Sequence, residues 1–185
     1  GTYFVNQDVL IPRPETEILV DHIKNNFLNL ENVLDLGTGS GCIAIEISKI
    51  FESATIFGSD ICEKALKVAK KNNNQSKNKV NFIKSNWFSD IEGQFDLIVS
   101  NPPYIPEGTK LEASTLFEPK VALFSEGTGL EDLKKIISEA ISYLKINGAL
   151  ILEHGIGQSS ELSSYMKKIG YKNIGILNDL KDINR

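Results

Sequence analysis

Residues 33–47 read VLDLGTGSGCIAIEI, which predicts a buried strand, a glycine-rich turn and a helix in immediate succession. The strand is the apolar run Val33–Leu36, and apolar residues at helical spacing follow from Ile43 to Ile50. The glycines between them let the turn adopt positive φ angles and let a ligand approach the main chain closely. In a doubly wound sheet, such a turn lies at the carboxyl edge of the strands, where ligands bind.

Strands and helices are predicted to alternate along the rest of the chain. Further short apolar runs predict strands at Ala54–Gly58, Val80–Ile83, Phe95–Val99, Ala149–Leu152 and Asn173–Leu177. Helical spacing of apolar residues occurs within 16–27, 65–69, 130–144 and 159–169. We therefore expect an α/β fold with a doubly wound, mostly parallel sheet. Residues 1–185 would form a single domain, in which 1–30 lead into a Rossmann-like core at 31–185, and the polar tract Asn72–Asn78 is interpreted as a solvated loop.

The composition is that of a folded, water-soluble chain. Its 185 residues are 41% hydrophobic and 24% charged, within the range of globular proteins. A net charge of −4 disfavours nucleic acid as a partner, although a local basic patch is left open. Cys42 and Cys62 are the only cysteines, which indicates a reduced, cytoplasmic protein, and no apolar run is long enough to span a membrane. His22 and His154 have no cysteine or histidine at ligand spacing, so we expect no metal site.

An acidic residue follows the glycine-rich turn at a spacing suited to a nucleoside. Asp60 closes the next strand, twenty-three positions after Gly37, where a carboxylate can accept hydrogen bonds from both ribose hydroxyls. The dinucleotide fingerprint G-x-G-x-x-G requires glycine at its sixth position, which is Cys42 in this chain. A nicotinamide cofactor is therefore the weaker hypothesis.

A second motif, Asn101-Pro102-Pro103-Tyr104, follows the strand at Phe95–Val99. The consecutive prolines lack N–H donors and fix φ at about −65°, so they predict a stiff turn at the strand end. The turn would present the Asn101 carboxamide and the Pro102 carbonyl as two acceptors beside the flat face of Tyr104. Two acceptors can orient a planar NH2 group, which is a poor nucleophile, and can stabilise the positive charge that develops during alkylation.

Both motifs resemble parts of known methyltransferases. Asp-Leu-Gly-Thr-Gly-Ser-Gly at 35–41 is similar to the first motif of class I enzymes that use S-adenosylmethionine. The resemblance implies that Asp60 holds the ribose of this cofactor and that its methionine part is wrapped by Gly37, Thr38, Gly39, Ser40 and Gly41. The Asn101–Tyr104 motif resembles the signature of enzymes that methylate adenine, cytosine or glutamine nitrogens. It implies catalytic roles for Asn101, Pro102, Pro103 and Tyr104, with Asn101 also beside the cofactor.

Together with the upstream segment VLIPRPETE at 9–17, these motifs resemble the release factor glutamine methyltransferase family, also called the HemK or PrmC family. Smaller matches are SNWF at 85–88, FEP at 117–119 and LEHG at 152–155. The resemblance implies that Trp87 stacks on the cofactor adenine. It also implies methyl transfer to the side-chain nitrogen of glutamine in the Gly-Gly-Gln motif of class-1 peptide chain release factors. Relatives have an amino-terminal helical docking domain and a last antiparallel strand, both of which we expect to be absent from residues 1–185, and fusion to a further domain stays open.

Several alternatives remain at this point. The substrate could instead be a glutamine of a ribosomal protein or an adenine of DNA or RNA, and the domain could bind without catalysing. Arg13 is interpreted either as a contact to the cofactor carboxylate or substrate backbone, or as an ion pair with Glu15 or Glu17. His154 is interpreted as structural rather than as a general base. Asn86 stands where many relatives have aspartate, but its side-chain oxygen can accept the same hydrogen bond from adenine.

Overall fold

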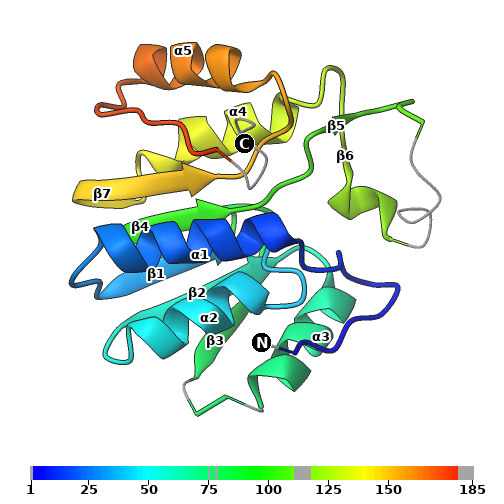
Figure 1. Ribbon diagram of the computed structural model, residues 1–185, viewed down its shortest axis with the longest axis vertical. Coiled ribbons are helices and arrows are strands. Elements are labelled where there is room, and N and C mark those ends of the chain that lie inside the picture. The colour runs from blue at the N-terminus through cyan, green and yellow to red at the C-terminus, as the bar shows by residue number, and fades with distance from the viewer. Residues whose placement is uncertain (1, 75, 78, 111–117, 179–185) are drawn as a thin grey trace.

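The structure is a computed structural model that describes residues 2–74, 76–77, 79–110 and 118–178. A five-stranded sheet with the order β3-β2-β1-β4-β7 forms its centre, and every neighbouring pair of strands is parallel (Figure 1). The strands are β1 (Asn32–Leu36), β2 (Thr55–Asp60), β3 (Val80–Lys84), β4 (Phe95–Ser100) and β7 (Leu144–Leu152). The predicted doubly wound, parallel α/β fold is therefore confirmed.

Both faces of the sheet are buried, which explains the nearly continuous apolar runs of the central strands. Successive residues of β1 enter different clusters: Val33 packs with Leu97 and Val99 on one face, while Leu34 and Leu36 pack with Ile98 on the other. All six side chains are fully buried. The alternation allows β1 and β4 to serve as the rigid centre of the molecule.

Helices cover the two faces as separate layers. On one face, α1 (Pro14–Asn26) and α2 (Cys42–Ile50) contribute Leu19, Ile23 and the apolar side of α2 to the core, and α3 (Glu63–Asn73) lies beside α2 (Figure 1). On the other face, α4 (Glu131–Ala140) packs against the sheet, and α5 (Ser159–Ile169) packs against α4. None of the helices in the described part of the chain is long and apolar enough to cross a membrane.

A small second sheet projects beyond the carboxyl ends of the main strands (Figure 1). Its two parallel strands are β5 (Ile105–Pro106) and β6 (Phe124–Ser125), and the short 3-10 helix η2 (Lys120–Ala122) precedes β6. Phe117 of the FEP match lies outside the described residues. This small sheet stands next to the edge at which ligands bind in parallel α/β folds.

The register of the main sheet brings three strand ends to the same level. Leu36 at the end of β1 pairs with Ser59 of β2 and with Ser100 of β4. Ser100 Oγ also donates a buried hydrogen bond of 2.7 Å to the Leu36 carbonyl. Asp60 at the end of β2 and the residues that follow β1 and β4, Gly37 and Asn101, therefore lie side by side at this edge of the sheet.

Some sequence-based boundaries were wrong. Leu144, predicted on a helix, begins β7, because α4 ends at Ala140 and the chain reverses into the sheet. Residues 173–177 form no strand: Asn173 has a φ of 55°, which interrupts extended backbone, and only Asn178 makes an isolated bridge. Asn72 and Asn73, predicted in a solvated loop, belong to α3. β7 is the edge of the main sheet, and the described residues include no antiparallel strand beside it.

Candidate active site

A cavity of about 1140 Å³ opens at the carboxyl edge of the sheet. Its lining comes from the turn after β1, the end of β2, the residues just after β3, the turn after β4 and the segment around η2 and β6. Residues 8–10 and Pro12, which precede α1, contribute a further wall. The cavity thus gathers most of the residues that the sequence analysis assigned to the cofactor and acceptor site: Gly37, Thr38, Gly39, Ser40, Asp60, Trp87, Asn101, Pro102 and Pro103.

The backbone of the glycine-rich turn requires its glycines. Gly37, Gly39 and Gly41 have φ angles of 67°, 53° and 82°, a region in which other residues are strained. Gly41 lies behind the turn rather than among the lining residues, and a Cβ at this position would come within 3.1 Å of the Ala69 Cβ on α3. Glycine at 41 therefore permits the turn to rest directly against α3.

Asp60 lies at the end of β2 and joins the turn to the start of α3. Its Oδ2 accepts a hydrogen bond of 3.0 Å from the Gly39 N–H, and its Oδ1 accepts one of 2.8 Å from the Cys62 N–H. Burial raises the pKa of the Asp60 carboxyl above its ordinary value, and these two backbone hydrogen bonds partly oppose the rise. Each oxygen retains a further lone pair, so the carboxylate can also accept hydrogen bonds from the two hydroxyls of a ribose.

Asp35 supports the same turn from within the sheet. Its Oδ2 accepts hydrogen bonds from the Thr38 hydroxyl at 2.6 Å and the Ala44 N–H at 3.2 Å. Its Oδ1 is buried and has no hydrogen-bond partner among the described residues. Burial raises the pKa of Asp35 to about 7, although the two hydrogen bonds favour the charged form. The sequence motif included Asp35, but only the structure reveals this environment.

Trp87 forms the side of the cavity that follows β3. Its backbone has a positive φ of 51°, and its carbonyl accepts a hydrogen bond of 2.7 Å from Ser85 Oγ. The indole N–H donates to Asp132 Oδ1 at 3.2 Å, and the ring lies 3.5 Å from the position that a Cβ of Gly37 would occupy. The half-buried indole is thus fixed next to the glycine-rich turn, with Asn86 exposed beside it on the cavity wall.

Asn101, Pro102 and Pro103 line the cavity directly beyond the end of β4. The Asn101 side chain is half-buried and makes no hydrogen bond with any described residue. Pro102 is buried, and the peptide bonds of both prolines are trans. The turn therefore holds an uncommitted carboxamide next to the glycine-rich turn, in the position that the sequence predicted.

Tyr104 is not among the residues that line this cavity. Its hydroxyl donates to Glu153 Oε1 at 3.0 Å, and its ring packs with Leu130 and Leu133. Its carbonyl accepts a hydrogen bond of 3.1 Å from Gln158 Nε2. Tyr104 thus lines a smaller neighbouring cavity and anchors the end of the Asn101–Tyr104 turn.

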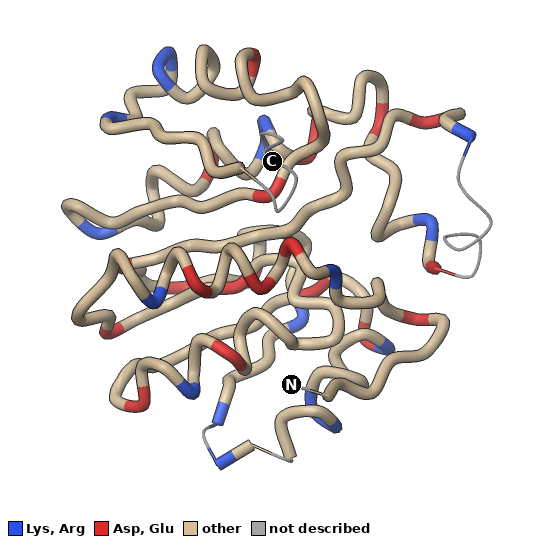
Figure 2. Tube along the Cα trace, in the orientation of Figure 1, with Lys and Arg blue, Asp and Glu red and all other residues tan. Residues whose placement is uncertain are grey.

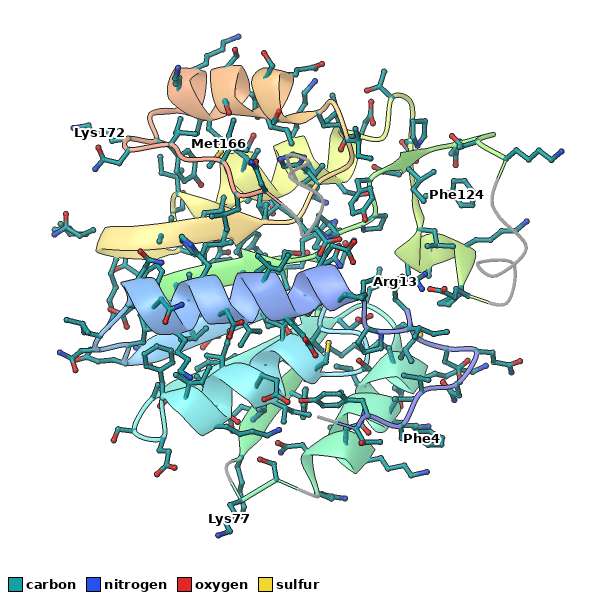
Figure 3. All side chains as sticks on the ribbon, in the orientation of Figure 1. Phe4, Arg13, Lys77, Phe124, Met166 and Lys172 are labelled. Carbon is teal, nitrogen blue, oxygen red and sulfur yellow. The ribbon has the colours of Figure 1, made fainter. Side chains whose placement is uncertain are left out.

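Arg13 pairs with a partner that the sequence did not suggest. Its guanidinium forms an ion pair with Glu118, whose side chain is 2% exposed, and the Glu118 Oε2 accepts a hydrogen bond of 3.4 Å from the Ile11 N–H. Figure 3 shows Arg13 at the start of α1, on the side of the molecule that carries the small sheet. The pair connects the PRPETE segment to the FEP segment, 105 positions away in the chain. The predicted pairing with Glu15 or Glu17 is therefore wrong, and Arg13 is not among the residues that line the cavity.

Two polar residues that support the site carried no recognisable sequence signal. Asn72, 6% exposed on α3, donates to the Ser40 carbonyl at 2.8 Å, and Gln158 bonds to the Tyr104 carbonyl. Both contacts join segments that are 32 or more positions apart, so local pattern could not reveal them. His154 is 7% exposed, and its Nδ1 lies 2.9 Å from the Gly155 carbonyl oxygen, as a structural histidine would be placed.

A parallel sheet in this strand order, with a glycine-rich turn after β1 and an aspartate at the end of β2, forms a doubly wound, nucleoside-binding arrangement. The matches to known methyltransferases identify it as the class I S-adenosylmethionine-dependent methyltransferase fold. Residues 14–128 match the family model of the methyltransferase small domain. A release factor glutamine methyltransferase from Buchnera aphidicola subsp. Baizongia pistaciae is 39% identical over 188 residues, which are 99% of this chain and 68% of that protein. The chain belongs to the release factor glutamine methyltransferase family.

Two further comparisons extend this result. A bifunctional methyltransferase from Rickettsia typhi is 40% identical over 209 residues, 99% of this chain and 40% of that protein. The chain therefore spans two fifths of that relative and about two thirds of the Buchnera protein. A solved complex from E. cuniculi, responsible for methylation of the eRF1 translation termination factor, has the same fold with a TM-score of 0.71 at 21% identity. The match covers 96% of this chain and 94% of that one.

Proposed function

We propose that this chain transfers a methyl group from S-adenosylmethionine to the side-chain amide nitrogen (N5) of the glutamine in the Gly-Gly-Gln motif of peptide chain release factors. The observation that carries the proposal is the pairing of Leu36 with Ser100, because it places the glycine-rich turn and Asn101 side by side in one cavity. Family membership supports the choice of glutamine as the acceptor. The cytoplasm, where translation ends, is the location that goes with this substrate.

The residues of the cavity fit the proposed cofactor. The Asp60 carboxylate suits a ribose, the Trp87 ring can flank the adenine, and Gly37–Gly41 permit close approach of the methionine part. A volume of about 1140 Å³ exceeds the roughly 300–1000 Å³ of ordinary ligand pockets, so it leaves room for a glutamine side chain beside the cofactor. When bound, S-adenosylmethionine supplies an electrophilic methyl group on its sulfonium.

In the proposed mechanism, Asn101 and Pro102 prepare the acceptor nitrogen. The lone pair of a glutamine amide is delocalised into its carbonyl, so the nitrogen is a poor nucleophile. The Asn101 carboxamide oxygen and the Pro102 carbonyl accept hydrogen bonds from its two N–H groups, which orients the nitrogen toward the cofactor and stabilises its developing positive charge. As the bond between nitrogen and methyl forms, the bond between sulfur and methyl would break to leave S-adenosylhomocysteine, and the nitrogen would release one of its two protons to water. Tyr104 contributes by fixing the turn through its hydrogen bonds rather than by lining the cavity.

The charge of the cavity wall favours a protein substrate over a nucleic acid. Among the described lining residues, six are acidic (Asp8, Asp60, Glu107, Glu126, Glu131 and Asp132) and two are basic (Lys120 and Lys135). An enzyme that presents an adenine to Asn101 would need basic residues there to bind the phosphates. The lysines of α3 and those just before β3, which are blue in Figure 2, are not among the residues that line the cavity.

The decisive experiment follows a labelled methyl group from S-adenosylmethionine to a purified release factor. Parallel reactions contain the factor with Gly-Gly-Gln changed to Gly-Gly-Ala, a ribosomal protein and DNA. The proposal expects label on the release factor that disappears with the glutamine. Label on the ribosomal protein or DNA alone would contradict the release factor as substrate and identify a different one. Absence of transfer despite cofactor binding would contradict catalysis by this chain. The bifunctional relatives make fusion to a further domain part of the proposal for the whole protein.

A further inference from the structure

Asn72 is a buried polar residue that the proposed mechanism does not use. It lies in the last turn of α3 and is 6% exposed, whereas the other buried residues of this helix, Ala65, Leu66, Val68 and Ala69, have apolar side chains. A buried carboxamide is costly unless its donors and acceptor are satisfied. The contacts of Asn72 therefore indicate what the residue stabilises.

The Asn72 amide joins two segments that are far apart in the sequence. Its Nδ2 donates to the Ser40 carbonyl at 2.8 Å and to the Phe4 carbonyl at 3.0 Å. Its Oδ1 accepts a hydrogen bond of 2.8 Å from the Phe4 N–H. These partners fix the orientation of the amide, because the reversed orientation would place its oxygen against two carbonyl oxygens.

One of these segments is the glycine-rich turn. One helical turn before Asn72, Ala69 touches the turn at Gly41, where a Cβ would come within 3.1 Å. Ala69 and Asn72 are three positions apart and lie on the same face of α3. The helix α3 therefore supports the turn by steric contact at Gly41 and by a hydrogen bond to the carbonyl of Ser40. Ser40 is itself one of the residues that line the cavity.

The other segment is the wall formed by residues before α1. Phe4 lies beside α3 (Figure 3), and Lys71 Nζ is 3.3 Å from the centre of its ring. Further along this segment, Val9 is 2% exposed, packs against Ala65 and Val68 of α3, and lines the cavity. Asn72 thus stands where α3, the glycine-rich turn and the N-terminal wall meet.

We propose that Asn72 is a positioning residue that sets the glycine-rich turn and the N-terminal wall in the arrangement that binds the cofactor. The inference rests on the proposed function, because it assumes that the turn holds S-adenosylmethionine. Asn72 touches neither the cofactor nor the reacting atoms. Its loss weakens binding of the cofactor and leaves presentation of the glutamine by Asn101 unchanged.

The test compares Asn72→Ala, Asn72→Asp and Asn72→Ser with the same substitutions at Asn74, which is exposed just beyond α3. Asp keeps the acceptor for the Phe4 N–H but cannot donate to the Ser40 carbonyl, whereas Ser retains one donor. Dissociation constants for S-adenosylmethionine and S-adenosylhomocysteine are measured by calorimetry, and cooperative unfolding is measured in denaturant. The rate of methyl transfer at saturating cofactor is measured on the proposed glutamine substrate.

Asn72→Ala and Asn72→Asp are expected to raise both dissociation constants about 10-fold, the effect of losing one to two net hydrogen bonds, with Ser intermediate. The rate at saturating cofactor should change less than about 3-fold, and the Asn74 variants should match the wild type. Cooperatively folded Asn72 variants with unchanged dissociation constants would overturn the inference, as would loss of cooperative unfolding in all three. If the wild type binds the cofactor but transfers no methyl group, only the proposed reaction is contradicted. If the wild type binds neither S-adenosylmethionine nor S-adenosylhomocysteine, the proposed reaction and the role of Asn72 are both overturned.

Discussion

The glycine-rich turn after β1 and the Asn101–Tyr104 turn after β4 are neighbours with different constraints. The first is held at each of three successive residues: Thr38 bonds to β2, Gly39 to Asp60 and Ser40 to Asn72. In the second, the described residues leave the Asn101 carboxamide without a hydrogen bond, and the anchoring contacts fall on Tyr104. A turn that only binds a cofactor can use its polar groups to hold itself rigid. A turn that offers a hydrogen-bond acceptor to a substrate must leave one polar side chain without an internal partner.

The largest expected effect comes from the free carboxamide. Asn101→Ala should reduce turnover about 100-fold or more, because it removes a preorganised acceptor for the charge that develops on the amide nitrogen. The dissociation constant for the cofactor should stay within about 2-fold of the wild-type value, since the glycine-rich turn is untouched. Steady-state kinetics and calorimetry measure the two quantities, with Asn74→Ala as the exposed control. Equal turnover by Asn101→Ala and the wild type would contradict the assignment of Asn101 to presentation of the substrate amide.

On the binding side, Asp60→Ala should show the opposite pattern. It removes the proposed acceptor for the ribose and the partner of the Gly39 and Cys62 N–H groups. The dissociation constant for S-adenosylmethionine should rise about 30-fold, as expected for loss of hydrogen bonds to a charged group. Turnover at saturating cofactor should fall much less. Asp60→Asn, which keeps one acceptor, is the matched variant, and a loss confined to turnover would contradict the assignment.

A smaller effect is expected from the residue that anchors the second turn from behind. Gln158 Nε2 donates to the Tyr104 carbonyl at 3.1 Å and to the Gly129 carbonyl at 3.4 Å, and its Oε1 accepts from the Gly155 N–H at 2.7 Å. Gln158→Leu should lower turnover about 10-fold with little change in cofactor affinity, because the end of the turn loses its anchor.

Gln158→Glu separates the two functions of that side chain. Glutamate keeps the acceptor for the Gly155 N–H and loses only the donated bonds, so its turnover should resemble that of Gln158→Leu. Methyl-transfer rates at saturating cofactor provide the measurement. Weakened cofactor binding in either variant would show that the two turns are not supported independently.

The same comparison shows what the sequence could predict. The glycine-rich turn, Asp60 and the Asn101–Tyr104 turn were located correctly, because glycine, proline and a strand-end carboxylate impose local constraints that are visible in a single sequence. Their convergence followed from the rule that parallel strands end at one edge of the sheet. The strand order then placed Gly37 beside Asn101 in the structure.

The supporting contacts could not be predicted in this way. Asn72 occurs in a run of Asn, Gln, Ser and Lys that is typical of a loop, and only packing of α3 against the glycine-rich turn buries it. The Arg13–Glu118 pair depends on the path of two distant segments, so the nearby Glu15 and Glu17 were the obvious partners by sequence. The prediction of a strand at residues 173–177 was wrong, because an apolar run becomes a strand only when a neighbouring strand pairs with it.

The smallest expected effect tests the buried carboxyl beneath the glycine-rich turn. Because the pKa of Asp35 is raised to about 7 in the folded chain, the folded state retains a proton that the unfolded state has already lost. The stabilising contribution is complete below the pKa of about 4 in the unfolded chain and disappears as the pH rises through 7. Between pH 6 and 7 this group should lower the free energy of unfolding by about 1 kcal/mol. Asp35→Asn keeps an acceptor for the Thr38 hydroxyl but does not titrate, so denaturant unfolding of this variant should lack that decrease. If the wild type and Asp35→Asn showed the same pH dependence, Asp35 would be ionised in the folded protein throughout the range from pH 6 to 7, which would contradict the prediction.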